Sequence, residues 1–384
     1  MKKICMLLTN AFEPDVRVYK EAKYLVDKGC SVEILCWDRK KDSCRKRKER
    51  VDGINIIRFR KPSIAGTGFR QIGAFLGFVN ACRKYCKKRH FDYFHCNDFD
   101  GAVVWSFIKN DKARMIFDMH EYYEGARGMS RISSFLIRKA IIYFIKRSNY
   151  SLYENDLYLK KAYDSVKNKL LQLKNYPDLD IIKFIPKKEA EEFRVGYHGD
   201  VRNQIPEFKT LFEAVKDISD IRVDIHGGGI DLPKLIELEQ EYKNVYIHGP
   251  YNGLLESTEL YANTDVVFAG YQPKAKRKEY EEIVKFYECI VTGTPIIMTE
   301  SYIGMALKIN KYGFGLTCDT LDVESVKKAI VKLKEDKKFW KKCHQSELLE
   351  APKYNWNNEV KVLDIAYDLE GRDENIINEC STTA

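Results

Sequence analysis

Several features that would place the chain in a familiar class are missing from its 384 residues. No stretch approaches the roughly 20 apolar residues that a bilayer-spanning helix needs. The short apolar run after Met1 leads directly into polar and charged residues, unlike a secretory signal. The sequence has no GxGxxG or Walker A pattern, which counts against dehydrogenases and P-loop enzymes. It also has no helix-turn-helix, zinc-finger or aromatic-rich sheet pattern, so a nucleic acid is not expected as a partner.

The cysteines do not suggest a disulfide framework. They number eleven and are irregularly spaced, which favours reduced thiols and a cytoplasmic location in a chain without a signal peptide. Structural zinc sites normally pair close-spaced ligands with a second, distant pair. We therefore expect packed helix residues rather than a metal site, and no cofactor, at the one cluster that could bind zinc: Cys82, Cys86, His90, His95 and Cys96.

The net charge of +9 is unevenly placed. Basic residues gather in the first half of the chain, in Arg39–Arg50, Arg83–Arg89 and Arg131–Arg147. In the third segment they recur between bulky apolar residues at a spacing close to two helical turns. Such a helix suits an anionic membrane surface, which would make the protein peripheral to the inner face of the membrane. It suits equally a domain helix with a solvated basic edge, and both interpretations stay open.

Short apolar runs alternate with amphipathic stretches in two successive series. Strand, helix, strand at this rhythm predicts an α/β fold with two doubly wound, Rossmann-like domains facing a central cleft. Ligands of such sheets bind beyond the carboxyl ends of the strands. We expect one domain at 1–180, a second at 190–350, a helical segment at 351–370 and a flexible tail at 371–384.

Polar side chains follow three strands of the first series. They lie in Asn10–Arg17, His95–Asp100 and Asp118–Glu124. A helix is expected after the second of these clusters, near 102–109, and another near the end of the chain, at 358–369. Each cluster alone would serve loop capping and solvation. Three clusters of acidic, amide and imidazole groups at one sheet edge indicate a functional site.

The second series supplies groups suited to phosphate and ribose. Glycines in Gly196–Arg202 and His226–Gly229 let backbone N–H groups approach phosphates, and Arg202 can bind oxygens in a bidentate manner. Lys285 and Glu288 lie one helical turn apart and face the same side. Here a carboxylate can bind ribose hydroxyls, while Lys285 and the helix start favour phosphate. The alternative is an ordinary surface ion pair.

These segments together resemble the GT-B glycosyltransferases of family 4 type, over nearly the whole chain except its polar tail. The resemblance is carried by NAFEPDVRVYKEAKYLVDKGCSVEILCW, HCNDFD, MHEYYE, KFYECIVTGTPII and KYGFGL. It implies that the domain at 1–180 lies on the acceptor side and that the domain at 190–350 binds the nucleotide-sugar. It also implies a crossover helix at 351–370 that packs on the N-terminal domain. It also implies retention of anomeric configuration, a UDP- or GDP-sugar donor and no catalytic metal.

When the family's site residues are carried over by position, the resemblance implies that His120 contacts the donor sugar and that Glu288 binds the donor ribose. Lys285 would lie beside the diphosphate and Tyr251 near the base. The remaining assignments are Gly199 and Arg202 for donor binding, and Asn10, Asp15, Arg17 and Asp98 on the acceptor side.

The sequence departs from the family pattern at Asp200, Pro206 and Tyr280, where Arg, Lys and Glu are usual. We expect Arg202 and Lys285 to replace the usual phosphate clamp. The leading interpretation is a hexosyltransferase of cell-surface polysaccharide biosynthesis with a glycan or lipid-linked acceptor. The alternatives are a nucleotide-sugar 2-epimerase and a catalytically silent protein that binds a nucleotide-sugar.

Overall fold

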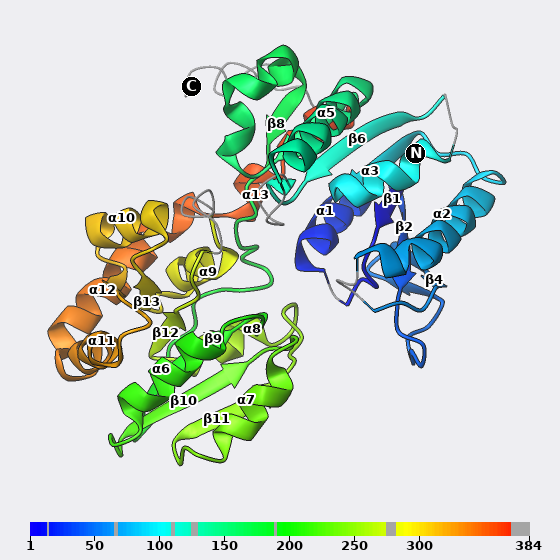
Figure 1. The fold of residues 1–384 in the computed structure, drawn as a ribbon. Coiled ribbons are helices and arrows are strands. Elements are labelled where there is room, and N and C mark those ends of the chain that lie inside the picture. The colour runs from blue at the N-terminus through cyan, green and yellow to red at the C-terminus, as the bar shows by residue number, and fades with distance from the viewer. Residues whose placement is uncertain are drawn as a thin grey trace. The chain divides into compact units, whose positions relative to one another are not determined.

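The chain forms two compact units, which divide between Lys174 and Asn175 and between Trp356 and Asn357. The computed structural model describes residues 1–13, 15–64, 68–108, 112–123, 130–187, 190–273 and 282–369. The first unit contains the N-terminal part and the C-terminal segment, and the second contains the residues between them. Each unit is built on one largely parallel sheet with helices packed on it (Figure 1). The predicted class of two doubly wound, Rossmann-like domains is confirmed.

The first unit has an eight-stranded sheet in the order β3-β4-β2-β1-β5-β6-β7-β8. Neighbours pair in parallel except β3 and β4, which form an antiparallel hairpin. Strand β1 is apolar along its length because a central parallel strand is covered on both faces. The strands are β1 (Lys3–Leu8), β2 (Ser31–Asp38), β3 (Lys48–Val51), β4 (Ile54–Arg60), β5 (Tyr93–Asn97), β6 (Arg114–Met119), β7 (Tyr150–Tyr153) and β8 (Leu170–Gln172).

Helix α1 (Val16–Asp27) shows how local sequence sets the element boundaries in this unit. The Asp15 side chain accepts a hydrogen bond from the Val18 N–H at the helix start, and Gly29 takes a φ of +80° just past its end. The other helices are α2 (Ile72–Cys86), α3 (Asp98–Ser106) and α5 (Arg131–Arg147), with 3₁₀ segments η1 (Gly68–Gln71), η2 (Asp156–Leu159) and η3 (Lys161–Lys169).

Helix α3 begins earlier than the expected helix near 102–109. Asp98, predicted to lie in a loop, is the first residue of this helix and has a φ of +57°. Its carboxylate accepts the backbone N–H of His120, a tertiary bond that holds this unusual conformation. Helical periodicity in the sequence does not reveal such a tertiary hydrogen bond, so it did not predict the early start of α3.

The C-terminal segment also differs from the expected single helix at 358–369. It forms a 3₁₀ turn and two short helices, and the break between the helices falls at Val360 and Lys361. The β-branched Val360 has a low helix propensity. From Asn357 on, the segment belongs to the first unit. There the Tyr367 carbonyl accepts a hydrogen bond from the Tyr93 hydroxyl, and Asp364 pairs with Lys28. The elements are η5 (Ala351–Lys353), α13 (Trp356–Glu359) and α14 (Val362–Ala366). The predicted flexible tail lies outside the described residues.

The second unit has a six-stranded parallel sheet in the order β11-β10-β9-β12-β13-β14. This is the dinucleotide-fold order, with the direction of winding reversed between β9 and β12. Its strands are β9 (Phe193–His198), β10 (Ile221–His226), β11 (Val245–Gly249), β12 (Val266–Ala269), β13 (Ile296–Thr299) and β14 (Gly315–Cys318). Its helices are α6 (Ile205–Val215), α7 (Leu232–Glu239), α8 (Ser257–Ala262), α9 (Val284–Thr292), α10 (Ile303–Tyr312), α11 (Val323–Glu335) and α12 (Lys337–Glu350).

Two hydrophobic cores cover opposite faces of this second sheet. Val266 and Phe268 of β12 contribute to the core under α6, α7 and α11, while Val267 and Ala269 contribute to the core under α8, α9 and α10. Alternate residues of a strand point to opposite faces. The sheet is therefore covered by packed helices on both faces.

Candidate functional site

In the first unit, a buried network of charged side chains forms where β1, β5 and β6 end. Arg17, in the first turn of α1, is only 5% exposed. Its guanidinium lies 2.8 Å from Asp118 and 3.2 Å from Glu154, and 3.1 Å from Glu21 one turn along the helix. The predicted acceptor-side Arg17 is therefore committed to buried carboxylates, which hold its side chain away from solvent.

His120 follows β6 and is held between two carboxylates. Its Nε2 lies 2.7 Å from Asp118, and its Nδ1 lies 3.6 Å from Asp98, beyond hydrogen-bond range. Burial opposes a charge on the ring, but Asp118 and Asp98 outweigh it and raise the pKa of His120 to about 10. The ring is therefore an imidazolium at neutral pH, with Nδ1 as its less engaged donor.

Three further residues complete this network: His95, which belongs to the predicted cluster His95–Asp100, and Glu21 and Tyr367, which sequence reasoning missed. Burial and the neighbouring Asp118 raise the pKa of Glu21 to about 8. His95 Nε2 lies 3.2 Å from Glu21, and His95 Nδ1 lies 2.6 Å from the hydroxyl of Tyr367. The sequence signal for His95 was its place in HCNDFD, at the end of a predicted strand. No such signal marked Tyr367, because it comes from the far end of the chain.

The loop between β1 and α1 places two other predicted residues near solvent. Asn10 is exposed; its Nδ2 donates to Asp15, and its Oδ1 accepts the N–H of Phe12, which has a φ of +53°. Asp15 also caps α1. Both side chains therefore shape the loop.

Removing the charge of Arg17 is expected to destabilise the first unit strongly. In Arg17→Met the carboxylates of Asp118 and Glu154 lose their buried partner, which typically costs about 3–5 kcal/mol. Urea unfolding monitored by circular dichroism measures the change. Lys23→Met is the matched control, because the Lys23–Asp27 pair on the same helix is exposed and should change stability by less than about 1 kcal/mol. Equal losses in both variants would contradict the network.

In the second unit, Lys285 lies beneath the loop that follows β9. It belongs to the first turn of α9 and is buried, and its Nζ has no hydrogen-bond partner among the described residues. The ammonium lies 3.4 Å from the centroid of the Tyr197 ring. Burial lowers the pKa of Lys285 to about 7, against the opposing effect of Glu288. A surface ion pair, the alternative from sequence, is therefore wrong for Lys285.

Gly199 brings the backbone close to that ammonium. Its φ is +147°, and a Cβ at this position would lie 3.0 Å from Lys285 Nζ. The Gly199 N–H donates to the His226 carbonyl, which ties the β9 loop to the β10 loop. A side chain here would fill the space beside the buried cation, so the glycine keeps that space open.

Glu288 lies one turn after Lys285 and accepts a hydrogen bond of 2.8 Å from the Tyr261 hydroxyl. Burial and Glu288 both raise the pKa of Tyr251, which places the phenol near this carboxylate. The structure thus brings together Gly199, Tyr251, Lys285 and Glu288. Tyr261 of α8 was missed, because an isolated tyrosine in a short helix carries no sequence signal.

Arg202 does not join this group as closely. Its side chain is 65% exposed and pairs with Asp200 at 2.8 Å. Because both partners are exposed, the pair is weak and easily exchanged for another anion. Tyr280, which stands where the family usually has a glutamate, lies outside the described residues.

The start of α9 supplies backbone hydrogen-bond donors beside the Lys285 ammonium. Its N-cap residue, Ile283, makes no side-chain capping hydrogen bond. The first N–H groups of a helix lack the usual intrahelical acceptors, and with the helix dipole they favour an anion at this end, next to Lys285. A glycine loop, a buried ammonium, a helix start and a carboxylate one turn away are together suited to a nucleoside diphosphate.

The structure is similar to solved glycosyltransferases. Sucrose-phosphate synthase from Thermosynechococcus elongatus shares 15% identity at a TM-score of 0.75, over 96% of this chain and 98% of that one. Anabaena HepE, in complex with UDP and glucose, shares 13% identity at a TM-score of 0.67, over 96% of this chain and 100% of that one. WaaG, a glycosyltransferase involved in lipopolysaccharide biosynthesis, shares 13% identity at a TM-score of 0.61, over 97% of this chain and 100% of that one.

These similarities establish the fold: the chain has the GT-B glycosyltransferase fold. The fold expected from the sequence resemblance is thereby confirmed. No family model matches the chain, and no curated protein matches it.

Proposed function

We propose that the chain is a retaining hexosyltransferase of family 4 type, which moves a sugar from a UDP- or GDP-sugar to a glycan or lipid-linked acceptor in cell-surface polysaccharide biosynthesis. The observation that carries the proposal is Lys285: a buried ammonium without a hydrogen-bond partner among the described residues, under the glycine loop at Gly199. Burying a cation in this way is costly unless an anion joins it. A diphosphate is the anion that this surrounding fits.

In the proposed reaction, the bond between the anomeric carbon and the diphosphate oxygen breaks while the acceptor oxygen attacks from the same face. The acceptor proton passes to a phosphate oxygen of the departing nucleoside diphosphate. Lys285 and the start of α9 stabilise the charge on that group, and Glu288 holds the ribose hydroxyls. Fixed cations and dipoles supply this stabilisation without a metal.

His120, in the first unit, is assigned to the donor sugar. As an imidazolium it donates from Nδ1 to a sugar hydroxyl, while its Nε2 stays bonded to Asp118. Arg17 acts through Asp118 by fixing its position. Asn10, Asp15 and Asp98 are assigned to the acceptor side, and Arg202 to a phosphate oxygen in exchange for Asp200.

The activity is tested by a donor panel. Purified protein is incubated with UDP-, GDP-, ADP- and dTDP-sugars, and the release of free nucleoside diphosphate is measured. We expect turnover of one donor, and its loss in Glu288→Ala. Glu259→Ala, an exposed carboxylate on α8, serves as control and should leave turnover unchanged. Tight binding of one nucleotide-sugar without turnover, even with membrane lipids supplied, would contradict the transferase and support the silent alternative.

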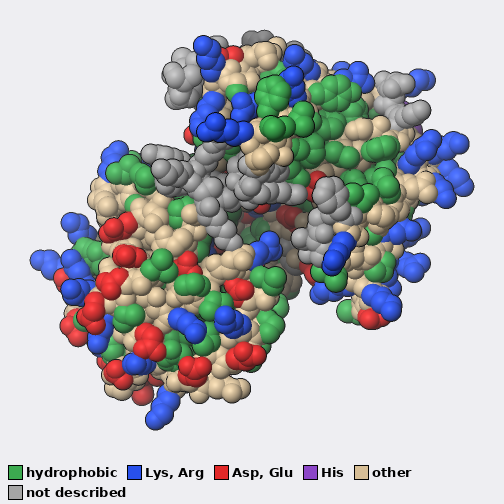
Figure 2. All heavy atoms as spheres, in the orientation of Figure 1, with side chains coloured by type: hydrophobic (Ala, Val, Ile, Leu, Met, Phe, Trp, Pro, Cys, Tyr) green, Lys and Arg blue, Asp and Glu red, His purple; other side chains and the backbone are tan. Residues whose placement is uncertain are grey.

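A second part of the proposal places the protein on an anionic membrane surface through α5. Among the described residues no helix is long and apolar enough to cross a bilayer. The solvent-facing side of α5 carries a stripe of large apolar residues at helical spacing, and Figure 2 shows hydrophobic and basic side chains side by side over this part of the first unit. The stripe is Ile132 (74% exposed), Phe135 (51%), Leu136 (59%) and Tyr143 (55%), with basic Arg131, Lys139, Lys146 and Arg147 exposed around it.

Charge reversal on α5 is expected to release the protein from anionic vesicles. Each Lys or Arg near such a surface contributes about 1 kcal/mol. Lys146→Glu with Arg147→Glu should therefore weaken sedimentation with phosphatidylglycerol-containing vesicles by roughly 30-fold or more. Lys327→Glu with Lys328→Glu, on α11 of the second unit, is the matched control. Vesicle binding that is unchanged by the α5 pair would contradict the assignment and leave the basic edge as a solvated surface.

A further inference from the structure

The face of the second sheet that carries α8 and α9 becomes polar toward its β11 edge. Along β10, buried Ile221, Val223 and Ile225 point into the core, while Asp224 and His226 point to the other face. A cavity of about 740 Å³ lies over this face, and its lining includes both residues and His248 of β11. A stability role alone would favour apolar side chains here, where a Rossmann-like sheet normally receives a covering layer.

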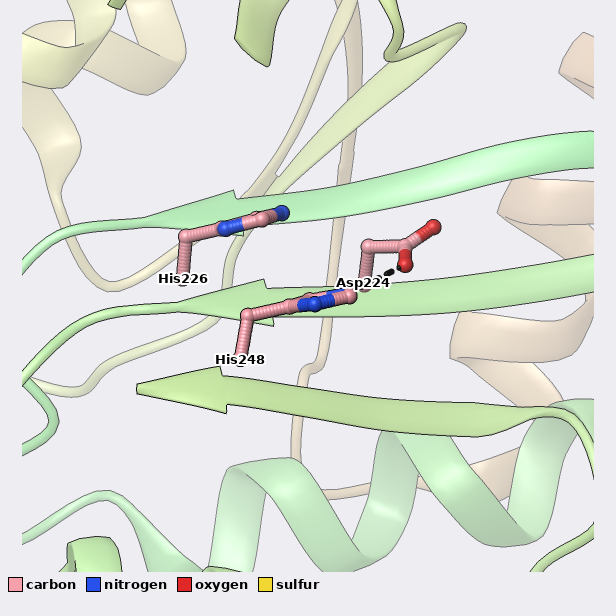
Figure 3. Close-up of side chains that lie close together, drawn as sticks. All are labelled: Asp224, His226 and His248. Atoms are coloured by element: carbon pink, nitrogen blue, oxygen red, sulfur yellow. Dashed lines mark hydrogen bonds and ion pairs between the residues drawn. The ribbon is translucent and has the colours of Figure 1, made fainter. Parts of the chain in front are cut away.

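The three side chains form a compact cluster, shown in Figure 3. Asp224 and His226 come from β10 and His248 from the neighbouring β11. One potential ligand atom from each lies within 4.8 Å of the others. The two imidazole rings are stacked at 4.2 Å and 5°, and His248 Nε2 lies 2.7 Å from Asp224 Oδ1. Because both strands belong to one hydrogen-bonded sheet, the backbone already holds these groups together.

We propose that Asp224, His226 and His248 bind a divalent transition-metal ion of the zinc type. Two imidazole nitrogens and one carboxylate oxygen are a ligand set that suits zinc and similar ions, whereas magnesium and calcium prefer oxygen alone. Metal–nitrogen bonds of about 2.0–2.1 Å need only side-chain rotation to draw the three groups inward. The cavity leaves the remaining coordination positions open to water or to a ligand.

Arg222 sets the strength of the site. Arg222 lies two residues before Asp224 on the same face of β10. Its guanidinium donates to both carboxylate oxygens of Asp224 at 2.9–3.0 Å. It thereby orients the carboxylate, but its charge also repels a cation. Removing that charge should tighten metal binding, an effect opposite to the removal of a ligand.

The site stands apart from the transferase proposal and does not depend on it. One backbone link joins the two, since the His226 carbonyl accepts the Gly199 N–H of the proposed donor loop. The metal test below reads ion binding alone, so its outcome is independent of whether the chain turns over a nucleotide-sugar.

The experiment titrates chelator-treated protein with Zn²⁺ by calorimetry, and with Co²⁺ by visible absorption. The background is Cys44→Ser, because Cys44 is an exposed thiol that could bind either ion. We expect one equivalent of the metal ion to bind to the parent. Its affinity should fall at least about tenfold in His226→Ala and in His248→Ala, because mutation of residues that only support a metal ligand already lowers metal affinity this much. Arg222→Gln should bind more tightly than the parent. His90→Ala, an exposed histidine of the first unit, is the control and should match the parent.

Circular dichroism and thermal unfolding establish that each variant is folded before titration. Cobalt bands without thiolate charge transfer, lost in the two histidine variants, would support the site. Binding of equal strength in the parent, His226→Ala and His248→Ala would overturn it, as would the absence of measurable binding in the parent and in Arg222→Gln.

Discussion

Lys285→Met is expected to weaken nucleotide-sugar binding by roughly 10- to 100-fold. A hydrogen bond to a charged group contributes about 1.5–3 kcal/mol, and each 1.4 kcal/mol is a factor of ten in affinity. Methionine keeps the length and apolar stem of the lysine, so the variant removes the charge while filling the same buried space. Isothermal titration of the donor identified in the panel gives the dissociation constants directly.

The same lysine predicts a pH dependence of binding. With its pKa lowered to about 7, Lys285 is largely neutral in the free protein at pH 8 to 9. An anion restores the charge, so binding takes up a proton above pH 7 and affinity falls with pH, approaching tenfold per unit. The doubly substituted diphosphate of a nucleotide-sugar does not titrate in this range. Lys285→Met should show a flat profile, and a parallel slope in both proteins would contradict the assignment.

Stability should change in the opposite direction. The folded pKa of Lys285 lies below its unfolded value of 10.5, so the unfolded chain binds more protons between about pH 7 and pH 10.5. The stability of the parent therefore rises through this window. Lys285→Met lacks that term and should be the more stable protein near pH 7, by a margin that shrinks toward pH 10. Lys234→Met, exposed on α7, is the control for both measurements.

His120→Ala is expected to lower kcat by about 10²–10³-fold, the usual cost of a positioned donor at a reaction centre. Because the pKa of His120 is raised to about 10, the ring stays charged across pH 6 to 9 and its titration should not appear in the rate profile there. Donor affinity in the second unit should change much less than kcat. His90→Ala, an exposed histidine, is the matched control.

The contribution of His120 to stability follows the raised pKa. It is fully present below the unfolded value near 6.5 and is lost as pH rises toward 10. The destabilisation by His120→Ala should therefore be larger at pH 6 than at pH 9. A kcat that is unchanged in His120→Ala would remove this residue from the proposed mechanism, whatever happens to stability.

The sequence predicted the fold well because both sheets are largely parallel and their central strands are buried. Apolar runs such as Ile4 to Leu8, separated by helices of regular length, determine strand positions and two-domain organisation. Four short strands were missed: β3, β7, β8 and β14. The hairpin of β3 was visible in Asp52-Gly53, which take φ of +47° and +85° as a tight antiparallel turn requires. The basic segment Arg39–Arg50 overlaps this strand and was interpreted only as part of the uneven charge distribution.

The candidate sites were predictable where residues lie close in sequence. Lys285 and Glu288 share a helix, so their spacing alone places them together. Partners joined by the tertiary fold were not predictable in this way. Tyr261 reaches Glu288 from another helix, and Tyr367 reaches His95 across 272 positions of the chain. Asp224, His226 and His248 form a cluster only once β10 and β11 pair.

The most direct test of the central claim is an NMR time course with the donor found in the panel and an acceptor or water. The account predicts release of nucleoside diphosphate, with the sugar first appearing in the anomeric configuration it had in the donor. An inverted product would contradict a retaining transferase. A nucleotide-sugar whose sugar is changed at carbon 2 would identify an epimerase, and an unchanged spectrum with tight binding would identify a silent relative.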